Sequence, residues 1–221
     1  MTRAPFYLEA LNTIPGISAH FVERVLGIKV DTDREATCAR LEPVHREVVQ
    51  GMGFSWADVY RGEQIHSADI AVIKKGDACR VLPGVDGLMT DNVGILLGIY
   101  VADCGAVYVV DRVRGAIALL HSGKKGTEQH ITAKAIRLMK RHYGSQPEDL
   151  YVALAPCIRP PAYEVDFAAK IRDQVLEEGV PESQFVDSGI CTSSDLERYY
   201  SYRIEKGNTG RMLALLGRQA C

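Results

Sequence analysis

The amino-acid sequence predicts an α+β fold (mixed α/β), with mixed or antiparallel sheets flanked by helices, in a single domain over residues 1–221. Two observations support this prediction. Between about residues 68 and 121, short apolar runs are cut by Gly, Pro and Asp, which is typical of successive strands. After this block, helical periodicity alternates with further apolar runs. A block of strands followed by a mixture of helices and strands favours α+β or mixed α/β.

The first predicted element is a helix over residues 35–50, because Leu41, Val44 and Val48 recur there with helical spacing. Pro43 is predicted to lie in an early turn of this helix, where a missing N–H costs little. The central strands are predicted over six runs, namely 69–73, 79–83, 86–90, 94–102, 106–110 and 116–120.

A helix is predicted to follow the block of strands. Thr127 is its expected N-cap, Gly144 lies just beyond its last turn, and one apolar face is formed by Ile131, Ala135, Leu138 and Met139. A buried strand is then expected over residues 150–158.

Two further elements are predicted near the C-terminus. Asp166 is a candidate N-cap for a helix that ends near Gly179. Residues 201–216 resemble two strands around a Gly-Asn turn.

Composition limits the classes of partner and compartment. Of the 221 residues, 47% are hydrophobic and 24% are charged, so the chain can bury a sizeable core. The formal net charge is −2 and no basic tract occurs, so a nucleic-acid or anionic-membrane partner has no electrostatic support. No apolar run approaches the roughly 20 residues that span a bilayer. Pro5 and Glu9 interrupt any apolar core of a secretory signal. A cytoplasmic location is therefore expected.

The six cysteines favour reduced thiols over a disulfide framework, since the chain is long and rich in core residues. No CxxC pair occurs, so a metal site would gather its ligands from distant positions.

Cys104 and His121 lie in two adjacent apolar runs that are expected to form a hairpin. With a turn centred on Arg112 and Val113, paired residue numbers sum to 225, so Cys104 faces His121 and Asp111 faces Arg114. A loop of two or four residues gives the same register, and the absence of Gly or Asn at 112 and 113 favours the longer one. The two side chains are therefore predicted to lie close together.

Such a pair allows two kinds of chemistry as well as simple core packing. A neighbouring imidazolium favours a nucleophilic thiolate, and a thiolate with an imidazole can also bind zinc. Asp103 and the SGKKGT segment after His121 bring charged groups to this end of the sheet. Because buried charge is costly, a polar pocket is predicted there in preference to a sealed core.

Five stretches carry a resemblance to a known family. They are QIHSADI (64–70), DGLMT (86–90), VADCGAVYVVDRVRGAIALLHSGKKGT (101–127), APCIRPPAYEV (155–165) and CTSSDLERYYSYRIEKGNTGR (191–211). Together they resemble the laccase-domain or multicopper polyphenol oxidase family, whose members are better described as purine nucleoside phosphorylases of broad specificity. The resemblance covers roughly residues 60–216.

The resemblance implies a third ligand, His66, and hence a His66, Cys104 and His121 zinc site with an open fourth position. Zinc there would polarise a water or a substrate atom, and copper at the same ligands is possible. The implied reactions are phosphorolysis of adenosine, guanosine, inosine and methylthioadenosine, together with deamination of adenosine. The implied partners are these nucleosides and phosphate. The other histidines, namely His20, His45, His130 and His142, match no motif and are predicted to be ordinary polar residues.

Further roles follow from the same resemblance. Asp103 would act as a base or orient a water, Arg24 and Lys125 would neutralise phosphate, and Glu164 would contact substrate. Each has a structural alternative. Arg24 could be a solvated helix-end residue, Lys125 part of a basic turn with Lys124, and Glu164 a cap of the next helix.

Two departures from the family keep other functions open. HSGKKG stands where the family has HSGWRG or HAGWRG, so Lys124 replaces a large aromatic, and the N-terminal S-T-R-x-G-G segment is poorly matched. The alternatives are a metal-free Cys-His hydrolase, a polyphenol oxidase (laccase-type) activity with copper, and a non-catalytic nucleoside-binding member. The sequence leaves the preferred nucleoside, the oligomeric state and the pathway unassigned.

Overall fold

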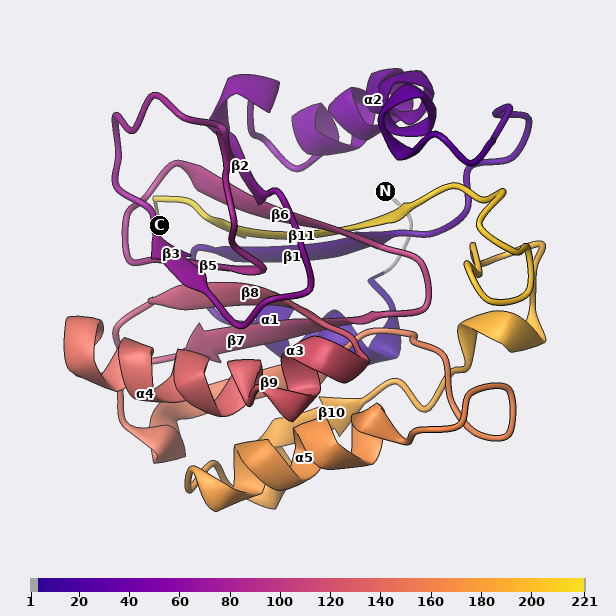
Figure 1. The fold of residues 1–221 in the computed structure, drawn as a ribbon. Coiled ribbons are helices and arrows are strands. Elements are labelled where there is room, and N and C mark those ends of the chain that lie inside the picture. The colour runs from indigo at the N-terminus through magenta and orange to yellow at the C-terminus, as the bar shows by residue number, and fades with distance from the viewer. Residues whose placement is uncertain (1–3, 221) are drawn as a thin grey trace.

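The computed structural model describes residues 4–220, and these form two stacked β-sheets with helices on both outer faces. The first sheet has the strand order β1-β11-β6-β2-β4 and the second has the order β10-β9-β7-β8-β5-β3. Figure 1 shows α2 over the first sheet, and α4 and α5 below the second. The predicted α+β class with mixed sheets is confirmed.

The elements follow one another closely along the chain. The helices are α1 (Phe6–Asn12), α2 (Arg34–Gly51), α3 (Lys124–Glu128), α4 (Ile131–Tyr143) and α5 (Phe167–Glu177). The strands are β1 (Ile17–Val22), β2 (Val59–Gly62), β3 (Ile70–Val72), β4 (Val81–Leu82), β5 (Gly87–Thr90), β6 (Ile95–Val101), β7 (Gly105–Asp111), β8 (Ile117–Ser122), β9 (Leu150–Leu154), β10 (Phe185–Asp187) and β11 (Met212–Arg218). Every strand predicted in the central block is present. No helix among residues 4–220 has the length and apolar character needed to cross a membrane.

Alternation along the strands builds the core in layers. In β7, Ala106, Tyr108 and Val110 point between the two sheets, whereas Val107 and Val109 face α4 and α5. A third cluster lies between the first sheet and α2. Both faces of the central strands are therefore buried, which explains why they read as nearly continuous apolar runs.

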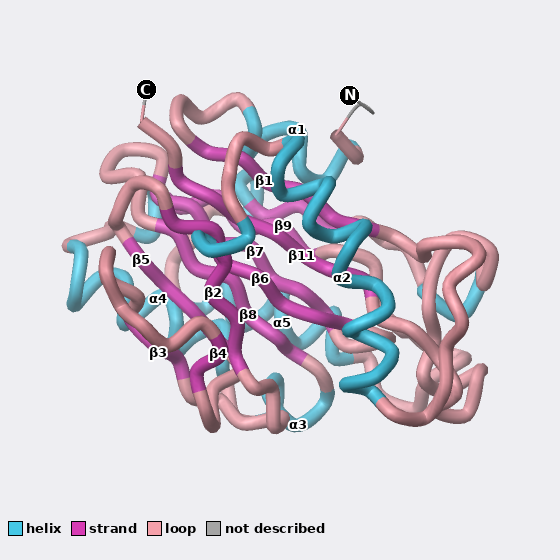
Figure 2. The backbone as a smooth tube through the Cα atoms, turned by 90° about the horizontal axis from the view of Figure 1, so that it is seen from above, coloured by secondary structure: helices cyan, strands magenta, loops and turns pink. Residues whose placement is uncertain are grey.

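The helix α2 confirms the first predicted element, with one correction. Asp33 caps it by accepting a hydrogen bond from the Ala36 N–H at 3.0 Å. Pro43 lies in the middle of the helix, so its predicted place in an early turn is wrong. Ala39, whose carbonyl loses its helical partner to Pro43, is exposed, and water can satisfy that oxygen. The helix crosses above the strands of the first sheet (Figure 2).

The single helix predicted from Thr127 is two helices. Thr127 lies inside α3, and its hydroxyl hydrogen-bonds to that of Ser122 at 2.9 Å, so the N-cap prediction is wrong. His130 adopts a left-handed φ of 58°, which turns the chain between α3 and α4. Gly144, with φ of 70°, ends α4 as predicted.

The predictions near the C-terminus are half correct. Asp166 caps α5 and accepts from the Ala169 N–H at 2.9 Å. The predicted pair of strands over 201–216 contains only β11, because residues 201–207 form turns. The Gly207 N–H donates to the Tyr202 carbonyl at 3.0 Å, and Tyr202 lies exposed.

The register of the β7–β8 hairpin differs from the prediction by two residues. Ala106 lies opposite His121 and Val110 opposite Ile117, so paired numbers sum to 227 and Cys104 does not face His121 directly. The Asp111 carboxylate accepts from the N–H groups of Val113 and Arg114, at 2.9 and 2.8 Å, and thereby widens the loop. Since the shift is two residues, Cys104 and His121 still share one face of the sheet.

Candidate active site

Three side chains meet at one end of the sandwich. The ligand atoms of His66, Cys104 and His121 all lie within 4.8 Å of one another. The His66 and His121 rings meet edge to face, with centroids 4.9 Å apart. His66 and Cys104 both lie on connections that cross from the first sheet to the second, between β2 and β3 and between β6 and β7. His121 lies on β8. The sandwich itself therefore brings the three together.

Asp86 holds two of these residues in place. Its carboxylate hydrogen-bonds to Nδ1 of His121 at 2.7 Å. It also accepts from the backbone N–H groups of Ile65, His66 and Ser67, at 3.1, 3.0 and 2.7 Å. The side chain is fully buried. Asp86 thus fixes the orientation of the His121 ring and the conformation of the loop that carries His66.

The backbone of this site adopts uncommon conformations. Gln64, His66 and Asp103 have left-handed φ angles of 62°, 65° and 79°. For a residue other than glycine, such a conformation costs on the order of 1–3 kcal/mol. The hydrogen bonds to Asp86 offset part of this cost for the His66 loop. The Gln64 side-chain amide donates to the Tyr100 carbonyl at 2.5 Å and accepts from the Tyr100 N–H at 2.9 Å.

Gly123 makes room for the Cys104 sulfur. A Cβ atom built on Gly123 would lie 2.3 Å from Sγ of Cys104, far inside any contact distance. The glycine after His121 and Ser122 is therefore required by the position of the thiol.

The electrostatics of the triad favour a charged thiol. Burial alone would raise the pKa of Cys104, but His121 and His66 lower it to about 6. Burial alone would lower the pKa of His121, but Cys104 and Asp86 raise it to about 9. Near neutral pH the pair is therefore a thiolate and an imidazolium, with the Asp86 carboxylate behind the ring.

The donor set fits a zinc ion. Two imidazoles and a thiolate are ligands that zinc prefers, and three protein ligands with a fourth open position are typical of catalytic sites. His66 is exposed and both histidines line a cavity, so an ion held by these residues would be reachable from that cavity. Asp86 supplies the carboxylate that metal-binding histidines commonly hydrogen-bond. Histidine and cysteine ligands also suit copper.

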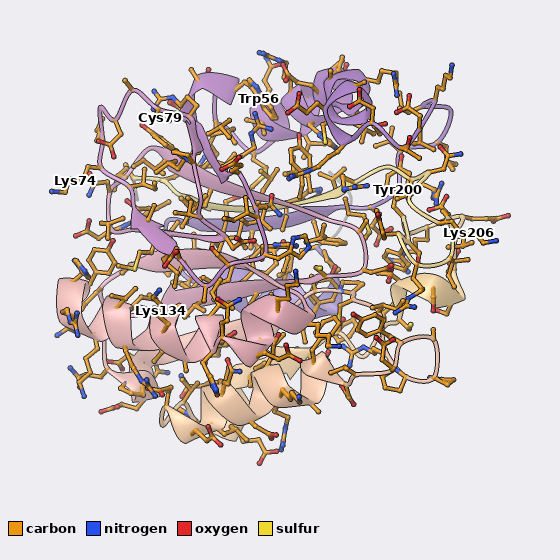
Figure 3. All side chains as sticks on the ribbon, viewed as in Figure 1. Trp56, Lys74, Cys79, Lys134, Tyr200 and Lys206 are labelled. Atoms are coloured by element: carbon orange, nitrogen blue, oxygen red, sulfur yellow. The ribbon has the colours of Figure 1, made fainter. Side chains whose placement is uncertain are left out.

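The cavity beside the triad has a volume of about 710 Å³. Its wall carries His66, Asp103 and His121, three aromatic rings and four basic side chains. The aromatic residues are Tyr100, Tyr163 and Tyr202, and the basic residues are Arg34, Arg203, Lys206 and Arg211. Lys206 lies at the end of the molecule where the C-terminal loops gather (Figure 3). A cavity of this size suits a small organic ligand.

Asp103 lies on the cavity wall, next to Cys104 in the chain, with both carboxylate oxygens engaged. Oδ1 accepts from the Thr192 hydroxyl at 2.6 Å, and Oδ2 accepts from the Arg203 N–H at 2.7 Å. These bonds tie the C-terminal loops to the connection that carries the thiol. In this arrangement Asp103 positions the cavity wall.

The other sequence-predicted residues do not line the cavity. Arg24 forms an ion pair with Glu205 at 2.8 Å and stacks on Tyr200, with Cζ 4.2 Å from the ring centroid. Lys125 is exposed on α3. Glu164 is exposed and forms an ion pair with Arg203 at 2.7 Å, and the cap of the next helix is Asp166.

Sequence reasoning missed Asp86 and the basic wall. Asp86 was visible only as part of the DGLMT segment, and nothing in the sequence pairs it with His121. Arg203 and Arg211 lie in the last of the motif stretches, which gives a weak signal. Arg34 lies outside every motif stretch.

Comparisons with known proteins identify the family of this chain. The family described as "multi-copper polyphenol oxidoreductase laccase" matches residues 16–170 and 165–219. A relative named purine nucleoside phosphorylase YlmD, from Geobacillus stearothermophilus, is 34% identical over 71% of this chain and 71% of its own length. The purine nucleoside phosphorylase SAR1163 of Staphylococcus aureus is 29% identical, also over 71% of each chain.

A solved structure shows the same fold. The crystal structure of YlmD from Geobacillus stearothermophilus superposes with a TM-score of 0.83 and 28% sequence identity, over 94% of this chain and 93% of that one. The matched family segments together span most of the chain, including all three residues of the triad. The chain therefore belongs to the multi-copper polyphenol oxidoreductase laccase family.

Proposed function

We propose that the protein is a zinc-dependent purine nucleoside phosphorylase. Its proposed substrates are adenosine, guanosine, inosine and methylthioadenosine, and deamination of adenosine is a proposed second activity. The observation that carries the proposal is the His66, Cys104 and His121 triad on the edge of a cavity of about 710 Å³. The names of the relatives support the same class of reaction.

The cavity offers groups suited to both substrates. Tyr163 and Tyr202 present aromatic surfaces for a purine, and the basic wall offers positive charge to phosphate. In phosphorolysis, a phosphate oxygen forms a bond to C1′ of ribose while the bond from C1′ to N9 of the purine breaks. The base leaves with the bonding electron pair. Zinc bound to the triad would supply a Lewis acid beside this cavity.

The structure supports the proposed roles of Asp103, Arg24, Lys125 and Glu164 to different degrees. Asp103 is proposed to act through the loops that it holds, and its role as a base or in orienting water stays a prediction. Arg24 and Lys125 stay predicted phosphate ligands, although Arg24 is already paired with Glu205. Glu164 is proposed to act on substrate through Arg203, with which it pairs.

We also propose a cytoplasmic location. The cysteines from Cys38 to Cys191 are all free, and a reducing compartment would keep them so.

One specific observation favours a second candidate, a metal-free Cys-His hydrolase. The pKa of Cys104 is lowered to about 6 by His121 and His66 despite burial, which gives a nucleophilic thiolate at neutral pH. His121 is the larger cause of this lowering, so in that reaction His66 would be dispensable, whereas it is a ligand in the leading proposal.

One assay separates these functions. Purified protein is incubated with each nucleoside, with and without phosphate, while free base and inosine are followed by chromatography and metal content is measured in parallel. The variants are Cys104→Ala and His66→Ala. Their matched controls are Cys79→Ala and His142→Ala, which remove the same residue types from exposed positions.

Phosphate-dependent release of base, about one zinc per chain, and loss of both in the two site variants would support the proposal. Zinc without any product would contradict it and favour a nucleoside-binding protein. Activity on another substrate that survives His66→Ala but not Cys104→Ala would favour the hydrolase. Phenol oxidation by copper-loaded protein, without release of base, would favour the polyphenol oxidase.

A further inference from the structure

The cavity wall carries more positive charge than the protein neutralises. Four cationic side chains line it, namely Arg34, Arg203, Lys206 and Arg211, against one carboxylate, Asp103. Both oxygens of Asp103 already accept hydrogen bonds from Thr192 and from the Arg203 backbone. The Arg203 guanidinium has its own partner in Glu164. The excess charge therefore belongs to Arg34, Arg211 and Lys206.

Arg34 and Arg211 are held in place by neutral groups. Nη1 of Arg34 donates to the Glu63 carbonyl at 3.1 Å. Nη1 of Arg211 donates to the carbonyls of Thr209 and Gly210, at 3.2 and 2.8 Å. Among residues 4–220, neither guanidinium forms an ion pair within 4.0 Å. Backbone carbonyls orient these two side chains but leave their charge uncompensated.

The two guanidiniums also interact with each other. Burial lowers the pKa of Arg211, the neighbouring Cys38 thiol raises it, and the positive charge of Arg34 lowers it. Arg211 comes directly before β11, and Arg34 is the first residue of α2, so two rigid elements bring like charges together. Like charges in a partly buried place are unfavourable unless an anion joins them.

The acidic neighbours of Arg34 do not compensate this wall. Asp33 and Glu35 flank Arg34 in the sequence, but both line a second, smaller cavity and not the one beside the triad. The Asp33 carboxylate is engaged as the cap of α2. Arg34 therefore lines the large cavity without a carboxylate from Asp33 or Glu35 beside it.

We propose that Arg34 and Arg211 form a binding site for a phosphoryl dianion in the same cavity as His66 and His121. Guanidinium groups bind phosphate oxygens with paired, charge-assisted hydrogen bonds, and two of them match a double negative charge. Lys206, exposed on the rim of this wall, adds a third cation. This site deepens the proposed function, on which its role in catalysis rests, and it differs from the Arg24 and Lys125 pair expected from the sequence.

Two sources of the phosphoryl group share this chemistry. One is free inorganic phosphate, the second substrate of phosphorolysis. The other is a phosphate ester on the organic ligand, such as a nucleoside monophosphate. The assay therefore measures binding of inorganic phosphate, adenosine and adenosine monophosphate separately, by calorimetry on the full chain.

The variants are Arg34→Gln and Arg211→Gln, with Arg211→Lys retaining charge but losing the paired geometry. Arg137→Gln is the matched control, since Arg137 is an exposed arginine of α4 that pairs with Glu178. Arg24→Gln and Lys125→Gln test the sequence-based expectation. Circular dichroism spectra and melting curves identify any variant that fails to fold. Arg34 lies at the surface of a helix terminus, so Arg34→Gln is expected to fold and to allow the binding measurement.

The Kd of inorganic phosphate is expected to rise about tenfold or more in Arg34→Gln and Arg211→Gln, since a charged hydrogen bond is lost in each. It should rise less in Arg211→Lys and stay unchanged in Arg137→Gln. If only adenosine monophosphate binding depends on the two arginines, the phosphoryl group belongs to the organic ligand. Unchanged binding of both phosphates in both Gln variants would overturn the inference, as would loss in Arg24→Gln or Lys125→Gln alone.

Failure of the site and failure of the proposed function are distinguishable. If phosphate binds through Arg34 and Arg211 but no nucleoside is cleaved, the proposed phosphate site is supported and the proposed phosphorylase activity is contradicted. If nucleosides are cleaved with an unchanged KM for phosphate in both Gln variants, the phosphorylase stands and this site does not.

Discussion

Two buried histidines, His121 in the triad and His45 in the core, titrate in opposite directions. His45 lies on α2, which covers the outer face of the first sheet, and it is fully buried, with Nδ1 3.1 Å from the Tyr100 hydroxyl and no partner at Nε2. Burial, together with the charge of Arg61, lowers its pKa to about 4. The pKa of His121 instead rises to about 9, against an equally unfavourable burial, because Cys104 and Asp86 face its ring.

The difference teaches that burial does not decide the charge of a histidine. His45 has only a hydroxyl as its partner and stays neutral near pH 7. His121 faces a thiolate and a carboxylate and stays protonated, and a metal ion bound to its ring would displace one proton. His45 was predicted to be an ordinary polar residue, and the assignment of His121 as a metal ligand stays a prediction. Substitutions in one region or the other test this contrast.

The largest effect is expected from Gly123→Ala. The new Cβ would lie 2.3 Å from Sγ of Cys104, so the thiol must leave its position and the metal site must open. We expect zinc affinity to fall by more than about 100-fold, since removing support for a ligand already costs 10–100-fold. Competition with a fluorescent chelator measures it. Gly51→Ala, where nothing lies within 4 Å of the new Cβ, is the matched control. Normal zinc affinity in Gly123→Ala would contradict the described packing.

The second effect is a pH dependence of stability from His45. Its pKa in the folded protein is about 4, against 6.5 in the unfolded chain, so the unfolded state binds more protons between these values. Its contribution is complete above pH 6.5 and is lost as the pH falls toward 4, by an amount on the order of 3 kcal/mol. Urea unfolding at pH 7 and pH 4 measures the loss.

The His45→Gln variant provides the comparison. It is less stable than the parent at pH 7, but its loss between pH 7 and pH 4 should be smaller by most of that amount. An equal loss in both proteins would show that other groups produce the acid sensitivity.

A third prediction concerns Asp86→Asn. An amide cannot accept from His121 and from three backbone N–H groups as a carboxylate does, so both His121 and the His66 loop lose support. Zinc affinity should fall about 10–100-fold while the fold is retained. Asp69→Asn, which removes an exposed carboxylate paired with Lys134, should leave zinc affinity unchanged. A rise in KM without a change in zinc affinity would assign Asp86 to substrate binding instead.

The smallest effect is expected from Asp33→Ala, which removes the cap of α2. The helix should lose about 1 kcal/mol of stability, the usual cost of losing such a cap. Because α2 carries both His45 and Arg34, the variant also tests whether a loss of helix stability weakens phosphate binding at Arg34. Thermal unfolding and phosphate binding are measured on the same sample. A stability unchanged from the parent would mean that the cap bond contributes nothing.

The sequence predicted well where one local signal decides the structure. Apolar runs between turn residues placed the central strands, and Asp166 capped its helix as expected. The hairpin register was wrong by two residues, since side-chain bonds from Asp111 set the loop width and periodicity does not report them. The proximity of Cys104 and His121 was confirmed because an even shift preserves the face.

The substrate wall was harder to predict than the triad. Arg34 and Arg211 line the same cavity because the start of α2 and the start of β11 both border it. Their proximity depends on the packing of segments nearly 180 residues apart, which no short motif records. The loop predicted as a strand supplies three of the basic and aromatic residues of the same wall, namely Tyr202, Arg203 and Lys206.

The left-handed backbone at Gln64, His66 and Asp103 has an evolutionary consequence. Glycine at any of these positions would relieve an unfavourable conformation, so replacing them could stabilise the fold while removing a ligand or a support of the cavity. Selection for stability alone would therefore favour glycine at these positions. The side chains that occupy them exchange part of the stability of the fold for groups that a metal or a ligand could use.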